Sequence, residues 1–301
     1  MRSSLLAAAW VGATLFSVPA VAQPDAPLTD QIRAVYVQPK EAGHQSIYQA
    51  LKDRGVLEIV RSLLSPLRLS RRLTIEVRGC DGRVDAYYGN DVATLCYEYI
   101  ELIQRHAPKV GTPGGVVRID AIFGAIIDTL LHEAGHGVFD ILDTPIFGRE
   151  EDAADFFSAY IMLRFATGDA QRLFEGVAFM FASEARAALE KPYNAAAYAG
   201  EHGLAPQRYY NLLCMAYGSD PTTFGKAALN GGLPQKRADG CAEEFERLEQ
   251  AFEKLIRPHV DKALLEKTRA QLRFAWQPLL SATDGLDALP LGDWPIGLST
   301  P

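Results

Sequence analysis

The sequence predicts an α+β fold that is mostly helical, with a small antiparallel sheet near the front of the chain. Alternating apolar and polar residues mark short strands only between residues 72 and 99. Apolar residues spaced three and four apart mark helices through most of the remaining chain. A short group of strands followed by a long run of helices is typical of the α+β class.

The composition is that of a globular protein. The chain has 301 residues, of which 48% are hydrophobic and 22% charged, enough for one large domain or two small ones. Its net charge of −7 argues against a protein that binds nucleic acid or an anionic membrane surface, because both need a basic face.

The first 22 residues have the pattern of a secretory signal peptide. Arg2 precedes an apolar stretch from Leu5 to Val18, and Ala20-Val21-Ala22 matches the small residues of a cleavage site before Gln23. A membrane anchor is the alternative, but the stretch is shorter than the roughly 20 apolar residues of a spanning helix. We therefore expect a periplasmic or secreted protein, cleaved after Ala22, with no membrane span in its mature form.

The expected export bears on the state of the four cysteines. In an oxidising compartment an even number of cysteines favours disulfides. Three pairings are possible, and the local one joins Cys80 to Cys96 and Cys214 to Cys241. A structural zinc on four cysteines is the competing interpretation, but the sequence has no CxxC. We favour two disulfides.

The elements follow in chain order. Residues 23–43 are polar and contain proline, which predicts a mobile lead-in, and residues 44–66 predict a helix that ends before Pro66. A half-buried strand at 72–78 precedes a hairpin whose strands, 83–89 and 92–99, flank the turn residues Asn90-Asp91. The glycine-rich segment 109–116 lacks the residues of a phosphate-binding loop and is predicted to be a connector. Further helices are predicted at 98–107, 117–142, 148–168, 170–189, 194–217, 240–256 and 260–280, and a poorly ordered tail at 281–301.

The predicted helix 117–142 contains the sequence LLHEAGHGVFD, which has a metal-binding pattern. His132 and His136 are four residues apart, so on a helix both imidazoles leave one face and can meet one Zn²⁺. Glu133 leans toward the same opening and can take a proton from the attacking water without being a ligand itself. Gly135 and Gly137 are poor helix formers, which indicates close approach by another part of the chain.

The next predicted helix offers a third ligand. Glu151 and Asp155 are four apart in GREEDAAD, so their carboxylates share one face. If this helix folds back on the first, Glu151 completes a His2Glu set and Asp155 accepts the free N–H of a ligating histidine. Glu150 is the rival third ligand, but the residue four positions later is Ala154, which cannot orient a histidine. The segment is alternatively an acidic first turn that the helix dipole favours.

HExxH followed by a downstream ExxxD helix resembles the gluzincin branch of zinc peptidases, whose familiar member is thermolysin. More narrowly, HEAGHGVFDILDTPIFGREEDAAD, DAYYGNDVATLCYEYIE and QRYYNLLCMAYGSDP resemble a family of exported bacterial metallopeptidases catalogued as a domain of unknown function. The resemblance covers roughly residues 30–256. It implies a single zincin-like domain, here 44–280, with an active-site helix under a small sheet and a second helix that brings the glutamate.

Matching the family's site residues to positions in this sequence implies that His132, His136 and Glu151 bind one Zn²⁺. Glu133 then matches the general base, and Asp155 matches the carboxylate that accepts a hydrogen bond from a ligating histidine. Fewer residues separate His136 from Glu151 than in thermolysin, which implies a trimmed connection between the two helices.

Peptide hydrolysis also needs a donor for the developing oxyanion. The segment 200–220 offers four candidates, His202, Arg208, Tyr209 and Tyr210, although tyrosines at helical spacing more often pack in the core. The strand 92–97 is a candidate edge for pairing with an extended peptide. The predicted function is a zinc-dependent metallopeptidase acting on a peptide or protein substrate. The alternative is a non-catalytic exported protein that binds zinc or a partner on a peptidase-like scaffold; the sequence identifies no partner protein.

Overall fold

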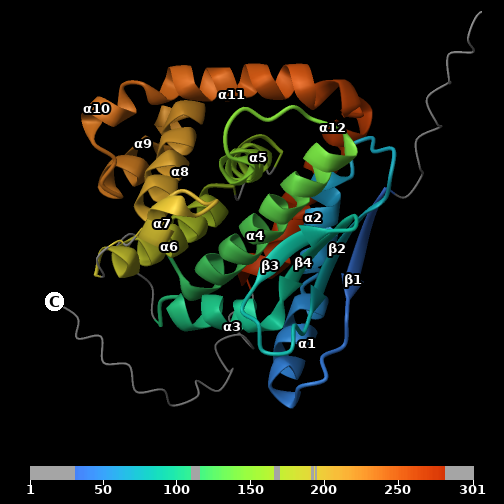
Figure 1. Cartoon of the computed structure of the whole chain (residues 1–301). Coiled ribbons are helices and arrows are strands. Elements are labelled where there is room, and N and C mark those ends of the chain that lie inside the picture. Colours follow the sequence, from blue (N-terminus) through green and yellow to red (C-terminus); the bar gives the residue numbers. More distant parts are fainter. Residues whose placement is uncertain (1–30, 110–115, 166–169, 191–192, 194, 282–301) are drawn as a thin grey trace, which may run out of the picture.

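The computed structural model describes residues 31–109, 116–165, 170–190, 193 and 195–281 (Figure 1). The predicted signal peptide 1–22, the start of the lead-in and the tail beyond residue 281 lie outside these residues, as does most of the glycine-rich connector. The strands are β1 (Ile32–Tyr36), β2 (Leu73–Arg78), β3 (Ala86–Gly89) and β4 (Val92–Cys96). The α-helices are α1 (Gln45–Asp53), α2 (Val56–Leu64), α3 (Tyr97–His106), α4 (Arg118–Ile141), α5 (Glu150–Arg164), α6 (Ala170–Leu189), α7 (Ala195–Ala199), α8 (Ala205–Ser219), α9 (Pro221–Asn230), α10 (Gln235–Ala238), α11 (Cys241–Leu255) and α12 (Lys262–Ser281).

The described strands form one small sheet in the order β1-β2-β4-β3 within a mostly helical molecule, so the α+β prediction is confirmed. The sheet is mixed rather than antiparallel. β1 and β2 are parallel, β2 and β4 are parallel, and only the hairpin pair β3–β4 is antiparallel. The difference arises because the second hairpin strand, not the first, pairs with β2 and leaves β3 at the outer edge.

The strand β1 lies in a segment that the sequence analysis assigned to a mobile lead-in. Residues 32–36 pair in register with residues 73–77 of β2, and the Ile32 side chain is buried. Helices α1 and α2 then form the crossover that a parallel β1–β2 pair requires. The prediction of a mobile segment is therefore wrong for these residues, whose identity as a strand depends on a partner 41 positions further along the chain.

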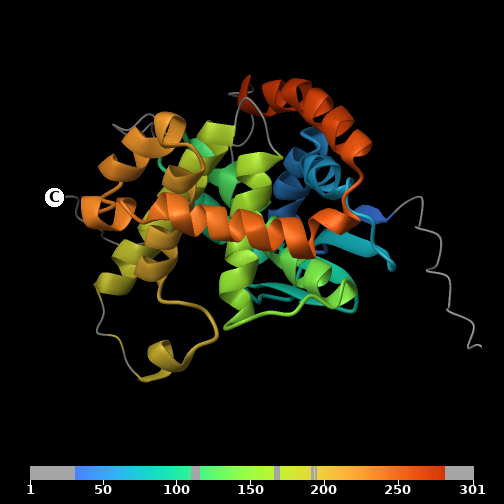
Figure 2. The same ribbon diagram turned by 90° about the horizontal axis from the view of Figure 1, so that it is seen from above.

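Helix α4 is the central element of the fold. It lies against β2, β3 and β4 on one side and contacts α5 and α6 on the other (Figure 1). Almost every position from Asp120 to Val138 is buried, as expected for a helix that is apolar nearly all round. Seen from above, α11 crosses over the helical part of the molecule (Figure 2). The helix that carries the HExxH motif is thus fixed from several directions.

The crossing of α4 and α6 requires glycine on both helices. A Cβ added to Gly176 would lie 2.1 Å from the carbonyl oxygen of Asp120, and one added to Gly124 would lie 2.7 Å from that of Leu173. Both obstructions are backbone atoms, which cannot rotate away as a flexible side chain would. The two helix backbones are therefore in direct contact beside the candidate site.

We expect Gly176→Ala to lower the free energy of unfolding by about 2–3 kcal/mol, because α6 must move away from α4 to admit the methyl group. Chemical denaturation measures the change. Gly43→Ala is the matched control, since a Cβ at Gly43 would meet nothing within 4 Å, and its effect should stay within about 0.5 kcal/mol. Equal stability of the two variants would contradict the close contact.

Two predicted helices are interrupted. The helix predicted at 44–66 divides into α1 and α2 at Gly55, which has a φ of 60°. The helix predicted at 194–217 divides into α7 and α8, and the intervening loop contains Gly200 and Gly203. Pro206 then stands at the start of α8, where a missing N–H costs nothing. The second interruption matters for the site, because the loop contains His202.

Both local disulfides are present. Cys80–Cys96 ties the segment before the hairpin to the end of β4, and Cys214–Cys241 joins α8 to the first residue of α11. Disulfides are consistent with an oxidising, extracytoplasmic compartment. Within the described part of the chain, no helix combines the length and the apolar character needed to cross a membrane.

Candidate metal centre

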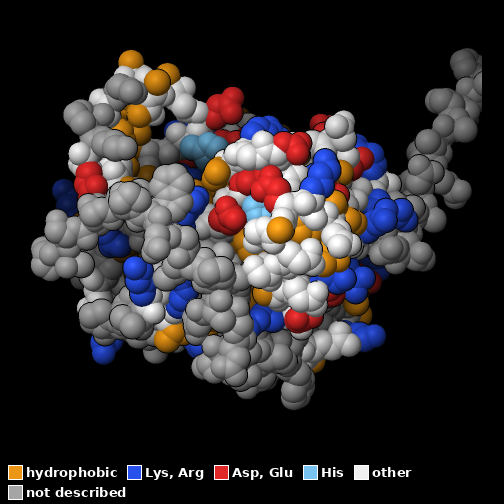
Figure 3. Space-filling view, turned by 90° about the horizontal axis from the view of Figure 1, so that it is seen from below, with side chains coloured by type: hydrophobic (Ala, Val, Ile, Leu, Met, Phe, Trp, Pro, Cys, Tyr) orange, Lys and Arg blue, Asp and Glu red, His pale blue; other side chains and the backbone are white. Residues whose placement is uncertain are grey.

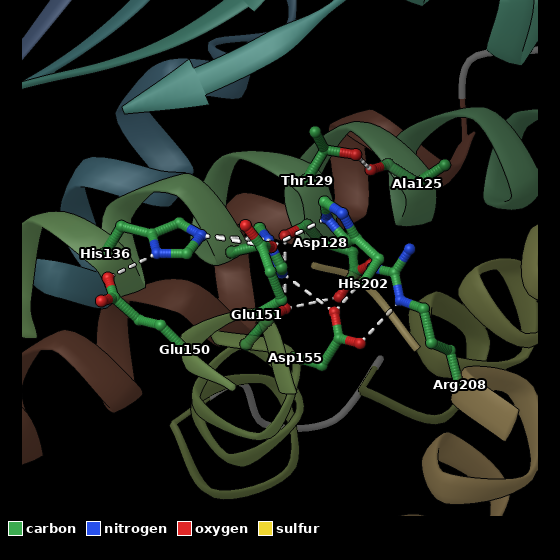
Figure 4. Close-up of polar contacts among 11 residues, drawn as sticks. Ala125, Asp128, Thr129, His136, Glu150, Glu151, Asp155, His202 and Arg208 are labelled. Atoms are coloured by element: carbon green, nitrogen blue, oxygen red, sulfur yellow. Dashed lines mark hydrogen bonds and ion pairs between the residues drawn. The ribbon is translucent and has the colours of Figure 1, made fainter. Parts of the chain in front are cut away.

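Helices α4 and α5 bring two imidazoles and a carboxylate together (Figure 4). His132 Nε2 and His136 Nε2 lie 3.3 Å apart. Glu151 Oε2 lies 3.0 Å from His132 Nε2 and 3.5 Å from His136 Nε2. The positive φ of Asp143 and Gly148 allows the short connection to turn the chain back from α4 to α5.

These three atoms fit the donor set of a zinc ion. Ligand atoms about 2.0–2.2 Å from one tetrahedral ion lie about 3.3–3.5 Å from each other, close to the distances found here. Two imidazole nitrogens with one carboxylate oxygen are also a donor set that zinc accepts. His132, Glu151 and His202 form a second possible group, since their ligand atoms lie within 4.8 Å of one another.

The outer nitrogen of each helical histidine faces a carboxylate. His132 Nδ1 donates to Asp155 Oδ1 at 2.9 Å, and His136 Nδ1 donates to Glu150 Oε1 at 2.8 Å. With each Nδ1 held by a carboxylate, each Nε2 is the nitrogen that faces the other imidazole and Glu151. Glu150, the rival third ligand, thus lies behind His136. From the sequence, Glu150 was considered only as a ligand.

Asp155 is itself held by Arg208 from the first turn of α8. Arg208 Nε donates to Asp155 Oδ2 at 2.8 Å, and Arg208 Nη2 donates to Asp155 Oδ1 at 2.7 Å (Figure 4). This bidentate pair completes a chain from α8 through α5 to His132 on α4. The sequence contains no local sign of it, because 53 residues separate Arg208 from Asp155.

These contacts set the charges of the cluster. Burial alone would lower the pKa of His132, but its hydrogen bonds to Asp155 and Glu151 outweigh burial and raise the pKa to about 10. The hydrogen bond from His132 lowers the pKa of Glu151 to about 2. Burial would raise the pKa of Asp155, yet hydrogen bonds from Arg208 and His132 hold it far below its usual range. Both carboxylates are therefore ionised at neutral pH, as a cation site requires.

Glu133 lies beside the cluster in a cleft of about 530 Å³. Its side chain is only 8% exposed, and burial raises its pKa above the usual range of a glutamate. Figure 3 shows acidic side chains gathered around histidines on the face where this region reaches the surface. The cleft is lined mainly by residues of β3, α4, α5 and α6, together with His202 and Arg208.

The strand that borders the cleft is β3, not the strand 92–97 expected from the sequence. β4 lies inside the sheet between β2 and β3, whereas β3 is at the edge and lines the cleft with Ala86, Tyr87 and Tyr88. The Tyr88 hydroxyl donates to Asp140 Oδ2 at 2.8 Å and so ties β3 to the end of α4.

Gly137 of the HExxH segment allows this approach. A Cβ at Gly137 would lie 2.6 Å from Leu73 Cδ1 and 2.9 Å from the Tyr88 ring. The close approach that the sequence indicated at this glycine is therefore the packing of β2 and β3 on α4.

Of the four candidate oxyanion donors, Arg208 and His202 line the cleft. Arg208 donates to Asp155, which leaves His202 as the donor that faces the cluster. Its Nε2 lies 2.8 Å from Glu151 Oε2, and its ring stacks on that of His132 at a centroid distance of 5.9 Å. Burial lowers its pKa, which favours the neutral imidazole.

Tyr209 and Tyr210 lie outside the cleft, which corrects their prediction as catalytic residues. The Tyr209 hydroxyl donates to the Gly231 carbonyl, and Tyr210 borders a separate hollow beside Arg149. On helix α8, the side that bears Arg208 faces the site, and the two residues after it turn toward other surroundings.

Comparison with known proteins gives one result. Neither a curated protein nor a solved structure matches the chain. Residues 36–256 match the model of a family described as "Putative metallopeptidase", a span that includes every residue of the cluster above. The chain, with its paired imidazoles and neighbouring carboxylates inside the matched span, therefore belongs to this metallopeptidase family.

Proposed function

We propose that this protein is a zinc-dependent metallopeptidase that hydrolyses peptide bonds, with His132, His136 and Glu151 as the ligands of one zinc ion. The convergence of His132 Nε2, His136 Nε2 and Glu151 Oε2 within 3.5 Å of one another carries this proposal. The match to the metallopeptidase family supports it independently. Zn²⁺ bound there would polarise the scissile carbonyl and lower the pKa of a water in the remaining position to about 7.

We assign a separate role to each residue around the remaining coordination position of the zinc ion. Glu133 would accept a proton from the attacking water and pass it to the leaving amine; its elevated pKa suits a group that must take up a proton and then release it. His202 would donate to the developing oxyanion rather than serve as a ligand, because its side chain lies on a loop and is half exposed. The open edge of β3 would hold an extended peptide by main-chain hydrogen bonds.

We further propose that the chain is exported to the periplasm or outside the cell after cleavage behind Ala22. The two disulfides support an oxidising compartment. N-terminal sequencing of the mature protein tests this: a first residue other than Gln23 would contradict the cleavage site.

A peptide library tests the activity. The purified protein, loaded with one equivalent of zinc, is incubated with a complex mixture of peptides, and new termini are identified by mass spectrometry. We expect cleavage that a chelator abolishes and that added zinc restores. Zinc binding without any new termini would contradict the peptidase and would favour the alternative, a non-catalytic metal- or partner-binding protein.

Asp155→Asn is expected to weaken zinc binding about 10–100-fold, because the amide can no longer accept from both His132 and Arg208 as a carboxylate does. Competition with a chromophoric chelator measures the affinity. Asp152→Asn is the matched control on the same helix, since Asp152 pairs with Arg149 instead. Equal affinity of the two variants would show that Asp155 does not orient a ligand.

A further inference from the structure

The cleft continues past His132 into a part that the proposed chemistry does not use. It extends along α4 toward the N-terminal end of the helix, where α6 and α3 close it. We call this part the inner pocket and define it by its lining residues: Tyr99, Asp128, Thr129, Phe181, Glu184 and Arg208. Asp128 is one helical turn before His132, about 6 Å along the helix axis, so a long side chain of a bound peptide can reach it.

The inner pocket contains more negative than positive charge. Arg208 is the cation there, and its Nε and Nη2 atoms are both engaged by Asp155. Two further carboxylates, those of Asp128 and Glu184, face the same space. The guanidinium and Asp155 neutralise each other, so the pocket retains two carboxylates in excess.

Within the part of the chain that the structure describes, neither of these two carboxylates forms an ion pair of its own, although the charge of Arg208 acts on both. Asp128 is 8% exposed and accepts a hydrogen bond from Ser158 at Oδ1. Among the described residues, no hydrogen-bond donor contacts the Glu184 carboxylate. Burial raises the pKa of Asp128 to about 6 and also raises the pKa of Glu184. Neighbouring groups thus offset only part of the free energy that it costs to ionise these two buried carboxyls. A bound cation would lower that free energy.

The walls of the pocket suit the stem of a long basic side chain. Phe181 already stacks under the Arg208 guanidinium, with 5.0 Å between the ring centroid and Cζ, and Tyr99 provides a second ring. Aromatic faces pack against the methylene groups of lysine and arginine and attract their charged ends. An acidic substrate side chain would instead meet two carboxylates of its own sign.

We propose that the inner pocket binds a lysine or arginine side chain of the substrate, so that the enzyme cleaves peptides close to a basic residue. This inference rests on the proposed peptidase function and adds its substrate class. Asp128 and Glu184 are the specificity-determining residues, and Tyr99 and Phe181 enclose the stem.

A set of matched peptides tests the proposal. Each peptide differs at one position only, which holds arginine, citrulline, lysine, acetyl-lysine or glutamate, and the position is moved along the sequence around the cleaved bond. At one position we expect kcat/KM for arginine to exceed that for citrulline about 10–100-fold, the range of one charge-assisted hydrogen bond. Lysine should exceed acetyl-lysine in the same direction, and glutamate should be the poorest.

Glu184→Gln should lower the arginine-to-citrulline ratio at least threefold. Glu175→Gln removes the same charge from the same helix outside the cleft and should leave the ratio unchanged. Calorimetry on the zinc-loaded Glu133→Gln variant, whose turnover is strongly slowed, measures binding directly, and the arginine peptide should bind more tightly than the citrulline peptide.

The outcomes separate the two proposals. If no peptide is cleaved by the zinc-loaded wild type, the peptidase function fails and its substrate class with it. If peptides are cleaved but arginine and citrulline are equivalent at every position, the peptidase stands and the inner pocket has been misassigned. A ratio that Glu184→Gln leaves unchanged would equally overturn the role of the inner pocket.

Discussion

Glu133→Gln is expected to lower kcat/KM by about 10²–10⁴-fold, the contribution of a positioned general base. The amide cannot accept the proton of the attacking water, although it has nearly the same size and remains in the same cleft. Zinc content should stay at one ion per chain, because Glu133 is not among the three converging donors. Steady-state kinetics on a cleaved peptide, together with metal analysis, measures both effects.

Glu246→Gln is the matched control, since Glu246 lies on α11 far along the chain and does not line the cleft. It should retain wild-type kinetics. If Glu133→Gln turned over peptide at the wild-type rate, another group would have to be the base.

His132→Ala is expected to abolish both zinc binding and activity. His132 contributes one of the three donors and also contacts Asp155 and Glu151. Losing a ligand should weaken zinc binding more than the hundredfold that loss of an orienting carboxylate can cause. Equilibrium dialysis against zinc at several concentrations measures the affinity, and peptide cleavage measures the activity.

His202→Ala distinguishes the two possible donor groups. If His132, His136 and Glu151 are the ligands, His202→Ala keeps its zinc while kcat falls, because only the oxyanion donor is lost. If His132, Glu151 and His202 are the ligands instead, His202→Ala loses zinc and His136→Ala retains it. The second pattern would replace His136 in the proposed site.

The part of the site that could be predicted from sequence is the part built from local spacing. His132 and His136 share a face because a helix repeats every 3.6 residues. The acidic residues of GREEDAAD, which follow Pro145 and the chain-breaking Gly148, indicate the first turn of the next helix. The hairpin was predictable for the same reason. Asn90 and Asp91 both adopt positive φ, which these residue types tolerate in tight turns.

The remaining parts depend on long-range contacts that no local pattern encodes. Arg208 reaches Asp155 across 53 positions, and Glu184 lines the same cleft as Asp128 because α6 packs on α4. The order of the strands also depends on long-range contacts, since β1 and β4 become neighbours of β2 only after the chain has folded.

One missed element did have a local signal. Asp220 caps α9 by accepting from the backbone N–H groups of Thr222 and Thr223, and Pro221 follows at the first helical position. This combination is a typical helix start, although no helix was predicted from the sequence between residues 217 and 240.

The most direct test of the account is the location of zinc in the loaded protein by anomalous diffraction at the zinc edge. We predict one ion about 2.0–2.2 Å from His132 Nε2, His136 Nε2 and a Glu151 carboxylate oxygen, with Asp155 and Glu150 behind the two imidazoles. A zinc ion bound elsewhere, or a Glu151 carboxylate turned away from both rings, would contradict it.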